Sequence, residues 1–194
     1  MTDAYRFDES STEQAIAYAK IYAGENYSPA METVLKVAFS EKRNLPTFRL
    51  KSSDTILLSG YMKKWVGAYL AGYNNRPSVR TGNCSGTHPD PMAKTILRAR
   101  IPGLEDNLAD KIVAGHSLLM TIENNIGELL EEYLSVKFSP LGWYCCWGST
   151  IDAVDFCKAD GSLLQIKTSD NSENSSSSRV RQGTPIGKWF RRFS

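Results

Sequence analysis

Two short apolar segments near the C-terminal end of the sequence each contain polar residues that could do chemistry. Asp155 lies in IDAVDF, residues 151–156, and Gln165 and Lys167 lie in SLLQIK, residues 162–167. Carboxylate and amide oxygens are ligands that Mg²⁺ accepts, and an ammonium group beside them can orient a water molecule or balance developing negative charge. These three residue types together favour hydrolysis of a phosphodiester at a divalent cation.

The connection CKADG between the two segments determines whether the three side chains share a face. The two segments predict a β-hairpin. A three-residue loop, Ala-Asp-Gly, that ends at a left-handed Gly161 places Asp155 opposite Gln165, and Lys167 then falls on the same face. A two-residue turn would place Asp155 on the apolar face, so we favour the longer loop. The opposite face is then apolar and contains Val154, Phe156, Leu164 and Ile166, with Asp152 at its solvent end.

Helices are expected to precede and support this hairpin. Ser10 and Glu13 form a capping box, and Ser28 followed by Pro29 is a typical helix start. The apolar spacing of residues 117–136 predicts a helix that packs on the sheet. The other expected helices are residues 11–23, 28–39, 54–71 and 91–100 and one that begins at 106, and residues 143–147, WYCCW, are an expected strand.

The composition is that of a globular chain. With 194 residues, 41% of them apolar, the chain can bury a core, most simply as one compact unit. No apolar run is long enough to span a membrane, and the N-terminus lacks a secretory signal, so we expect a cytoplasmic protein without membrane contact. The four cysteines show no zinc-type spacing and are expected to be reduced thiols.

Charge is unevenly distributed along the chain. The net charge is only +2, but residues 101–132 hold seven acidic residues against Lys111, whereas residues 179–194 hold five basic residues and no acidic one. The basic end favours an anionic partner. The loop at residues 73–91 is long for a plain connector, and its Arg76 and Arg80 could contact phosphates. An ordinary solvated loop is an equally good explanation.

Asp155 and the triplet Gln165-Ile166-Lys167 resemble the signature of the PD-(D/E)xK nuclease superfamily, an aspartate on one strand and acid-x-lysine on the next. The resemblance implies an α+β fold in which a small mixed sheet carries the catalytic hairpin between helices, with Mg²⁺ as cofactor. We expect a helical N-terminal region at residues 1–100 and the nuclease core with its basic tail at residues 101–194. The sequence departs from the signature at Val154, where proline is common, and at Gln165, which replaces the second acid.

The missing negative charge has several candidate sources. The superfamily often supplies a glutamate from the helix before the sheet, and that helix here reads IGELLEEYL. Glu128 is the first candidate, so that the resemblance implies Asp155, Glu128 and Gln165 as metal ligands. Glu131 and Glu132 lie about one turn away on the same helix. Glu132 and Glu173 are the alternatives, and a merely solvated helix face is the competing explanation.

The segment from Ile151 to Phe193 resembles type II restriction endonucleases, most closely the SinI-like group that cuts at GGWCC sites. The resemblance implies sequence-specific cleavage of double-stranded DNA that leaves a 5′ phosphate. Polar and basic side chains after the hairpin suit phosphate and base contacts. The candidates for DNA contact, besides Arg76 and Arg80, are Asn171, Ser172, Glu173, Asn174, Arg179, Arg181, Lys188, Arg191 and Arg192.

Other functions and the assembly stay open at this point. A repair, recombination or transposition nuclease of the same fold fits the hairpin, and so does a DNA-binding module that has lost catalysis, with Gln165 as the trace of that loss. A site read on both strands needs two active sites, so we expect a homodimer. Trp65, Tyr69 and Tyr73 form an aromatic stripe that could face a partner, although core packing explains it better. The abrupt ending at Ser194 leaves a truncated C-terminus open.

Overall fold

The computed structural model describes residues 7, 9–48, 57–80, 90–168 and 185–191 of the chain. Its contacts divide the chain into two compact units. The first unit comprises residues 1–76 and 131–194, and the second comprises residues 77–130. The boundary expected near residue 100 falls within the second unit.

Three helices of the first unit come from the N-terminal part of the chain. They are α1 (Thr12–Ala23), α2 (Pro29–Ser40) and α3 (Leu58–Asn74). The predicted start of α2 is confirmed, because Pro29 is its first residue and Ser28 Oγ accepts a hydrogen bond from Met31 N at 3.2 Å. Short 3₁₀ turns occupy Glu9–Ser11, Gly24–Asn26, Lys42–Asn44 and Ser139–Leu141.

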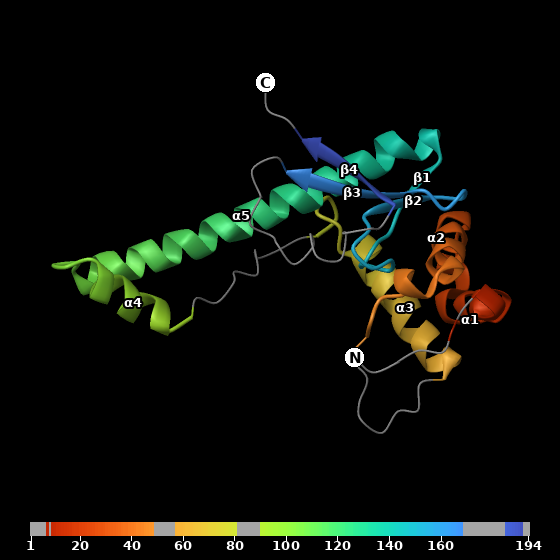
Figure 1. The fold of residues 1–194 in the computed structure, drawn as a ribbon, viewed down its shortest axis with the longest axis horizontal. Coiled ribbons are helices and arrows are strands. Elements are labelled where there is room, and N and C mark those ends of the chain that lie inside the picture. Colours follow the sequence, from red (N-terminus) through yellow and green to blue (C-terminus); the bar gives the residue numbers. More distant parts are fainter. Residues whose placement is uncertain (1–6, 8, 49–56, 81–89, 169–184, 192–194) are drawn as a thin grey trace. The chain divides into compact units, whose positions relative to one another are not determined.

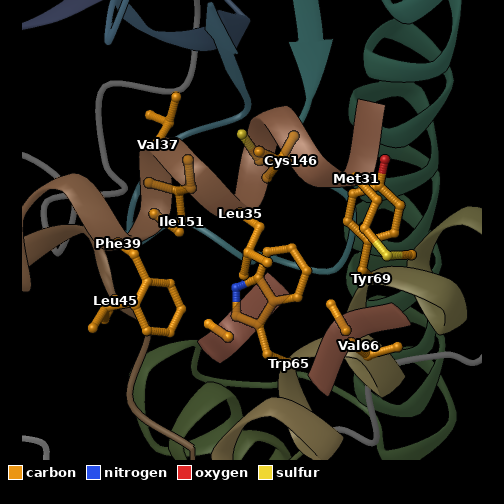
Figure 2. Close-up of a cluster of buried hydrophobic side chains, with 14 of the residues drawn as sticks. Met31, Leu35, Val37, Phe39, Leu45, Trp65, Val66, Tyr69, Cys146 and Ile151 are labelled. Carbon is orange, nitrogen blue, oxygen red and sulfur yellow. The ribbon is translucent and has the colours of Figure 1, made fainter. Parts of the chain in front are cut away.

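The core of the first unit lies where α2 and α3 meet the segment after the first strand. Figure 2 shows Trp65 of α3 beside Leu35 of α2, with Cys146 and Ile151 nearby. The indole Nε1 of Trp65 donates to the carbonyl of Thr150 at 2.9 Å, so the one polar atom of this ring is paired within the core. Trp65 and Tyr69 are both buried. The aromatic stripe therefore packs within the chain, as the simpler explanation held, and Trp65 and Tyr69 cannot face a partner.

A four-stranded mixed sheet completes the first unit (Figure 1). Its strands are β1 (Trp143–Cys145), β2 (Phe156–Lys158), β3 (Leu163–Thr168) and β4 (Ile186–Arg191), in the order β1-β2-β3-β4. The first three are antiparallel neighbours, and β4 runs parallel to β3. The predicted α+β class with a small mixed sheet is confirmed.

The strand expected over residues 151–156 is wrong except at Phe156. Residues 151–155 form turns, and Ala153 adopts a positive φ of 57°. Ile151 and Val154 are buried in the core, and the N–H of Asp152 donates to the carbonyl of Asn44 at 2.9 Å. The apolar residues of this segment thus fill the core from a turn, which their alternation could not reveal.

The second unit is built on two helices. It contains α4 (Met92–Arg100) and most of α5 (Asp106–Phe138), one continuous helix of 33 residues where the sequence suggested two. Lys94 lies 2.8 Å from the carboxylate of Asp110, and Arg98 lies 2.6 Å from that of Asp106, so ion pairs connect α4 to α5. None of the described helices is long and apolar enough to cross a membrane.

The expectation that residues 117–136 pack on the sheet is wrong for most of that stretch. Leu118, Ile122 and Leu129 are exposed. Only the end of α5 packs in the first unit, where Leu134 is buried and Phe138 meets Phe156 edge-on at 5.6 Å. Helical apolar spacing identifies a side of a helix but not the surface that covers it.

Candidate functional site

The hairpin of β2 and β3 has the predicted loop and register. Lys158 N donates to Ser162 O at 2.9 Å, and Gly161, with φ of 87°, donates from its N–H to Lys158 O at 3.0 Å. Asp160 Oδ1 accepts from Ser162 N at 2.9 Å, and hydrogen bonds from the Ser162 side chain and then from this N–H hold the pKa of the Asp160 carboxyl below its usual value. Phe156 pairs with Leu164 and Cys157 with Leu163, the register that the three-residue loop predicts, and Asp155 immediately precedes the first of these pairs. Local turn chemistry therefore sets the geometry of the site.

Asp155 lies immediately before β2 and is held from both neighbouring strands. Its backbone N–H donates to Leu164 O at 3.0 Å on β3, and its carbonyl accepts from Cys146 N at 2.8 Å, just beyond β1. Its side-chain Oδ2 accepts from Ile166 N at 2.6 Å. The chain turns away from the sheet at this point, and a carboxylate oxygen takes the place that a strand carbonyl would occupy. The carboxylate of Asp155 is thus fixed at the backbone of the residue between Gln165 and Lys167.

Gln165 is the buried polar residue of this hairpin. Its side chain is 9% exposed, and its Oε1 is buried without a hydrogen-bond partner. An unpaired buried amide oxygen is costly unless a donor or a cation meets it. Among the described residues no group of three or more His, Cys, Asp or Glu could hold a metal ion. Carboxylate and amide oxygens, as on Asp155 and Gln165, are of the ligand type that Mg²⁺ accepts, and Mg²⁺ keeps several waters and takes few protein ligands.

Lys167 follows two residues after Gln165 on β3 and is half-buried. Alternation along the strand places both side chains on one face. In the register of β4 with β3, Lys188 lies beside Gln165 and Phe190 beside Lys167. Lys188 is exposed, so a second ammonium flanks the site. Residues 186–191 were expected to belong to a basic tail, and the strand was missed; the strand-favouring residues Ile186, Trp189 and Phe190 were the available signal.

The glutamates of α5 have different surroundings. Glu128, in the second unit, lies 2.8 Å from Arg80 Nη2. Glu132, in the first unit, lies 3.3 Å from Arg76 Nε and is largely buried. Glu131 is half-buried in the first unit. Burial raises the pKa of the Cys145 thiol, and the charges of Glu131 and then Asp155 raise it further. Glu131 and Asp155 therefore act on a common neighbour.

Arg76 and Arg80, which were candidates for phosphate contact, both have partners within the chain. Arg76 also donates from Nη1 to Tyr73 O at 2.6 Å and lies over the Tyr73 ring. Arg80 also binds Asn125 Oδ1 at 2.9 Å. A cavity of about 480 Å³ in the first unit contains Arg76 and Glu132, but Asp155, Gln165 and Lys167 do not line it.

Other candidates for DNA contact cannot be placed. Asn171, Ser172, Glu173, Asn174, Arg179, Arg181 and Arg192 lie outside the described residues. Arg191, the last residue of β4, is half-buried and pairs in register with Thr168.

Comparisons with known proteins agree with the resemblance read from the sequence. The model of the SinI restriction endonuclease family matches residues 52–194, which include the whole hairpin. The type II restriction enzyme SinI of Salmonella infantis is 45% identical over 113 residues, 56% of this chain and 49% of that enzyme. The type II restriction enzyme Eco47I of Escherichia coli is 43% identical over 113 residues, with the same coverage of 56% and 49%. The chain thus spans about half the length of the curated relatives it matches. Because the family model covers well over half of the chain, the chain belongs to the SinI restriction endonuclease family.

Proposed function

We propose that this chain carries the catalytic hairpin of a type II restriction endonuclease that hydrolyses double-stranded DNA at a specific site with Mg²⁺. The observation that carries the proposal is the hydrogen bond from Ile166 N to Asp155 Oδ2. This bond holds a carboxylate at the backbone between Gln165 and Lys167, on a hairpin with a three-residue loop. The match to the restriction endonuclease family supports the same reaction.

The residues of the hairpin have distinct roles in this proposal. The oxygens of Asp155 and Gln165 hold the cation. Because Gln165 Oε1 is buried and has no hydrogen-bond partner among the described residues, binding the cation breaks no existing hydrogen bond of this oxygen. When bound, the cation supplies charge stabilisation at the phosphate and lowers the pKa of a bound water. Lys167 orients the attacking water with its ammonium group and balances the charge that develops on the phosphate. Attack on phosphorus breaks the bond to the 3′ oxygen and leaves a 5′ phosphate.

We propose Glu131 as the source of the second negative charge, in place of Glu128. Glu131 acts electrostatically on Cys145, as Asp155 does, and belongs to the same unit as the hairpin. Glu128 forms an ion pair with Arg80 within the second unit, and Glu132 is engaged by Arg76.

DNA contacts follow from the position of β4 and from the polar tail. Lys188 is exposed beside Gln165, which suits contact with a phosphate near the scissile bond. Residues 171–181 and Arg192 stay candidates for phosphate and base contacts. GGWCC is the proposed recognition site. Because one chain holds one catalytic set, cleavage of both strands at a symmetric site is proposed to need two copies.

Cleavage of a supercoiled plasmid that contains GGWCC sites tests the function. We expect discrete fragments with Mg²⁺ and none with EDTA. Lys167→Met should abolish cleavage, whereas Lys158→Met, at the other end of the same hairpin, should retain it. Cleavage by Lys167→Met at the wild-type rate would contradict the site assignment. Fragments without a common end sequence would favour a structure-selective nuclease of the same fold.

A second set of variants tests the ligands. Glu131→Gln should abolish cleavage and weaken Mn²⁺ binding measured by calorimetry, whereas Glu128→Gln should leave both unchanged. The reverse result would restore Glu128 as the ligand. Gln165→Glu should keep or raise activity, because it adds charge beside the cation.

Gln165 itself favours one other function, a DNA-binding module without catalysis, since a neutral residue stands where the superfamily signature has an acid. That function requires DNA binding without cleavage in any divalent cation. If Gln165→Glu then acquires cleavage, the loss of activity is assigned to this residue.

A further inference from the structure

One side of α5 carries regularly spaced apolar residues that are largely exposed in the part of the chain that the structure describes. Leu108, Ile112, Leu119, Ile122, Ile126 and Leu129, with Gly115 between the second and third, recur at intervals that alternate between four and three residues. This is the 3.5-residue repeat of a coiled-coil seam, sustained over three heptads. At 1.5 Å per residue the seam is about 32 Å long. We call these seven residues the α5 seam.

The seam is exposed, as is most of the surface of α5 in the second unit, where Leu118 and Met120 are also exposed off the seam. Five of its six large residues are exposed, and Ile126 is half-buried. The residues of the second unit that are buried, Ala109 and Thr121, lie off the seam. The ion pairs of α4 also reach positions off the seam, at Asp106 and Asp110, and Arg80 reaches Asn125 and Glu128. Exposure of an apolar stripe of this length to water is unfavourable in free energy, so such a stripe is typical of a surface that a partner covers.

A second copy of α5 in the antiparallel direction complements the seam. In the register centred between Leu119 and Ile122, Leu119 of one copy faces Ile122 of the other copy. Gly115 then faces Ile126 of the partner subunit, so a large side chain fills the space that the glycine leaves. The same register sets His116 against the partner's Glu123 at the flank, where an imidazole N–H can donate to the carboxylate.

A parallel pair is less complementary. It places Gly115 opposite its own copy, which leaves a gap in the interface, and sets Lys111 beside the partner's His116, where two groups that donate hydrogen bonds face each other. The antiparallel pair also closes on itself by a two-fold axis, the symmetry that a palindromic site requires.

We propose that two copies of this chain associate through the α5 seam in an antiparallel coiled coil. The proposal rests on the proposed function in one respect, because cleavage of both strands needs two active sites and therefore two copies. It adds the surface through which the two copies associate. The evidence for the surface is the seam itself, and it stands apart from the nuclease chemistry. The aromatic residues Trp65 and Tyr69 are buried and do not offer a competing surface.

Sedimentation velocity of the full chain without DNA tests the surface with two matched variants. Ile122→Glu changes a seam residue that is 44% exposed, and Met120→Glu changes an off-seam residue that is 40% exposed on the same turn. Both should keep the helix content of the wild type by circular dichroism, since both sites face solvent in one chain. Wild type and Met120→Glu should dimerise at about 50 μM, and Ile122→Glu should weaken dimerisation about 100-fold, because each dimer would bury two carboxylates against apolar groups.

Disulfide trapping tests the direction in a Cys84→Ser background. An equimolar mixture of Ile112→Cys and Leu129→Cys chains should form mixed disulfide dimers on oxidation, because the antiparallel register sets these positions opposite each other. Self-linked dimers of either variant alone would instead show a parallel pair and overturn the antiparallel direction.

Three outcomes would overturn the surface: a monomeric wild type at about 50 μM, wild-type dimerisation by Ile122→Glu, or equal weakening by Met120→Glu. These failures differ from failure of the nuclease proposal. Mg²⁺-dependent cleavage by a chain that never dimerises through α5 would reject the seam alone, whereas dimers that never cut DNA would reject the nuclease alone.

Discussion

At the scale of single residues, the site depends on Asp155 having two functions. One carboxylate oxygen accepts a hydrogen bond from Ile166 N, and in the proposed site the carboxylate also supplies negative charge for the cation. In the proposed site, one side chain thus carries both a structural bond and a catalytic charge. Substitutions at residue 155 can separate them, because an amide oxygen accepts the same hydrogen bond without carrying the charge.

We expect Asp155→Asn to keep the stability of the wild type and to lose cleavage. Asp155→Ala should lose cleavage as well, and should lower the free energy of unfolding by about 1–3 kcal/mol, because Ile166 N is left without its acceptor. Urea denaturation and plasmid cleavage measure the two effects. Equal stability of the two variants would show that the bond to Ile166 contributes little.

Asp152 provides a test of pH dependence that involves no catalysis. Burial raises the pKa of its carboxyl, although the side chain stays partly exposed. The folded state therefore disfavours the carboxylate at pH values above this raised pKa, and the penalty disappears below the unfolded value of about 3.9. Asp152→Asn should raise the urea midpoint at pH 7, and its advantage should shrink as the pH falls towards 4. An advantage that does not change with pH would show that charge is not its cause.

At the scale of elements, the sheet is held to the helices by a close backbone approach. A Cβ built on Gly72, near the end of α3, would lie 2.4 Å from Gly148 N, in the turn after β1. Gly148 has φ of 69°, and a Cβ there would lie 2.0 Å from Ala68 O. Two glycines thus allow α3 to pack directly on the turn that leads from β1 to the hairpin. Neither glycine sits in a local pattern that predicts this contact.

The pair Gly72→Ala and Gly67→Ala tests this contact within one helix. Gly72→Ala should lower the free energy of unfolding by about 1–3 kcal/mol, because backbone atoms must move apart. A Cβ on Gly67 would meet nothing within 4 Å, so Gly67→Ala should raise the free energy of unfolding by about 0.5–1 kcal/mol through helix propensity. Thermal and urea denaturation measure both. A stabilised Gly72→Ala variant would place the α3 contact elsewhere.

At the scale of the whole molecule, the two units are stabilised in different ways. In the first unit, helices and sheet enclose a core that contains the thiols of Cys146 and Cys157, and Cys145 of β1 is also buried. In the second unit, the described helices are connected by surface ion pairs and leave the α5 seam exposed. Surface ion pairs contribute little to stability. Self-association is therefore expected to stabilise the second unit more than the first.

The buried thiols report on global unfolding of the first unit. Burial raises the pKa of Cys145 and of Cys146, and Cys146 is affected further by a hydrogen bond with Cys157. In a Cys84→Ser background, Ellman's reagent at pH 8 should modify these three thiols only as the protein unfolds, at the rate measured by circular dichroism. Modification of any of them well before the loss of ellipticity would show that the sheet opens locally.

The sequence by itself determined the loop of the hairpin and the register of its two strands, from which the shared site of Asp155, Gln165 and Lys167 is proposed. Turn chemistry and strand alternation act over a few residues, and for that reason they can be read locally. The helix starts at Ser28 and near Pro91 also follow from local patterns. The family resemblance rested on the residues of the hairpin.

Only the tertiary structure decided which polar groups are engaged and which surfaces are covered. It showed residues 151–155 as turns in the core, joined β4 to β3, paired Glu128 with Arg80, and left Gln165 Oε1 buried without a partner. It also left the α5 seam exposed where the apolar spacing had suggested a packed helix. Each of these depends on contacts between residues far apart in the chain, and a periodic pattern states that a side is apolar without stating what will cover it.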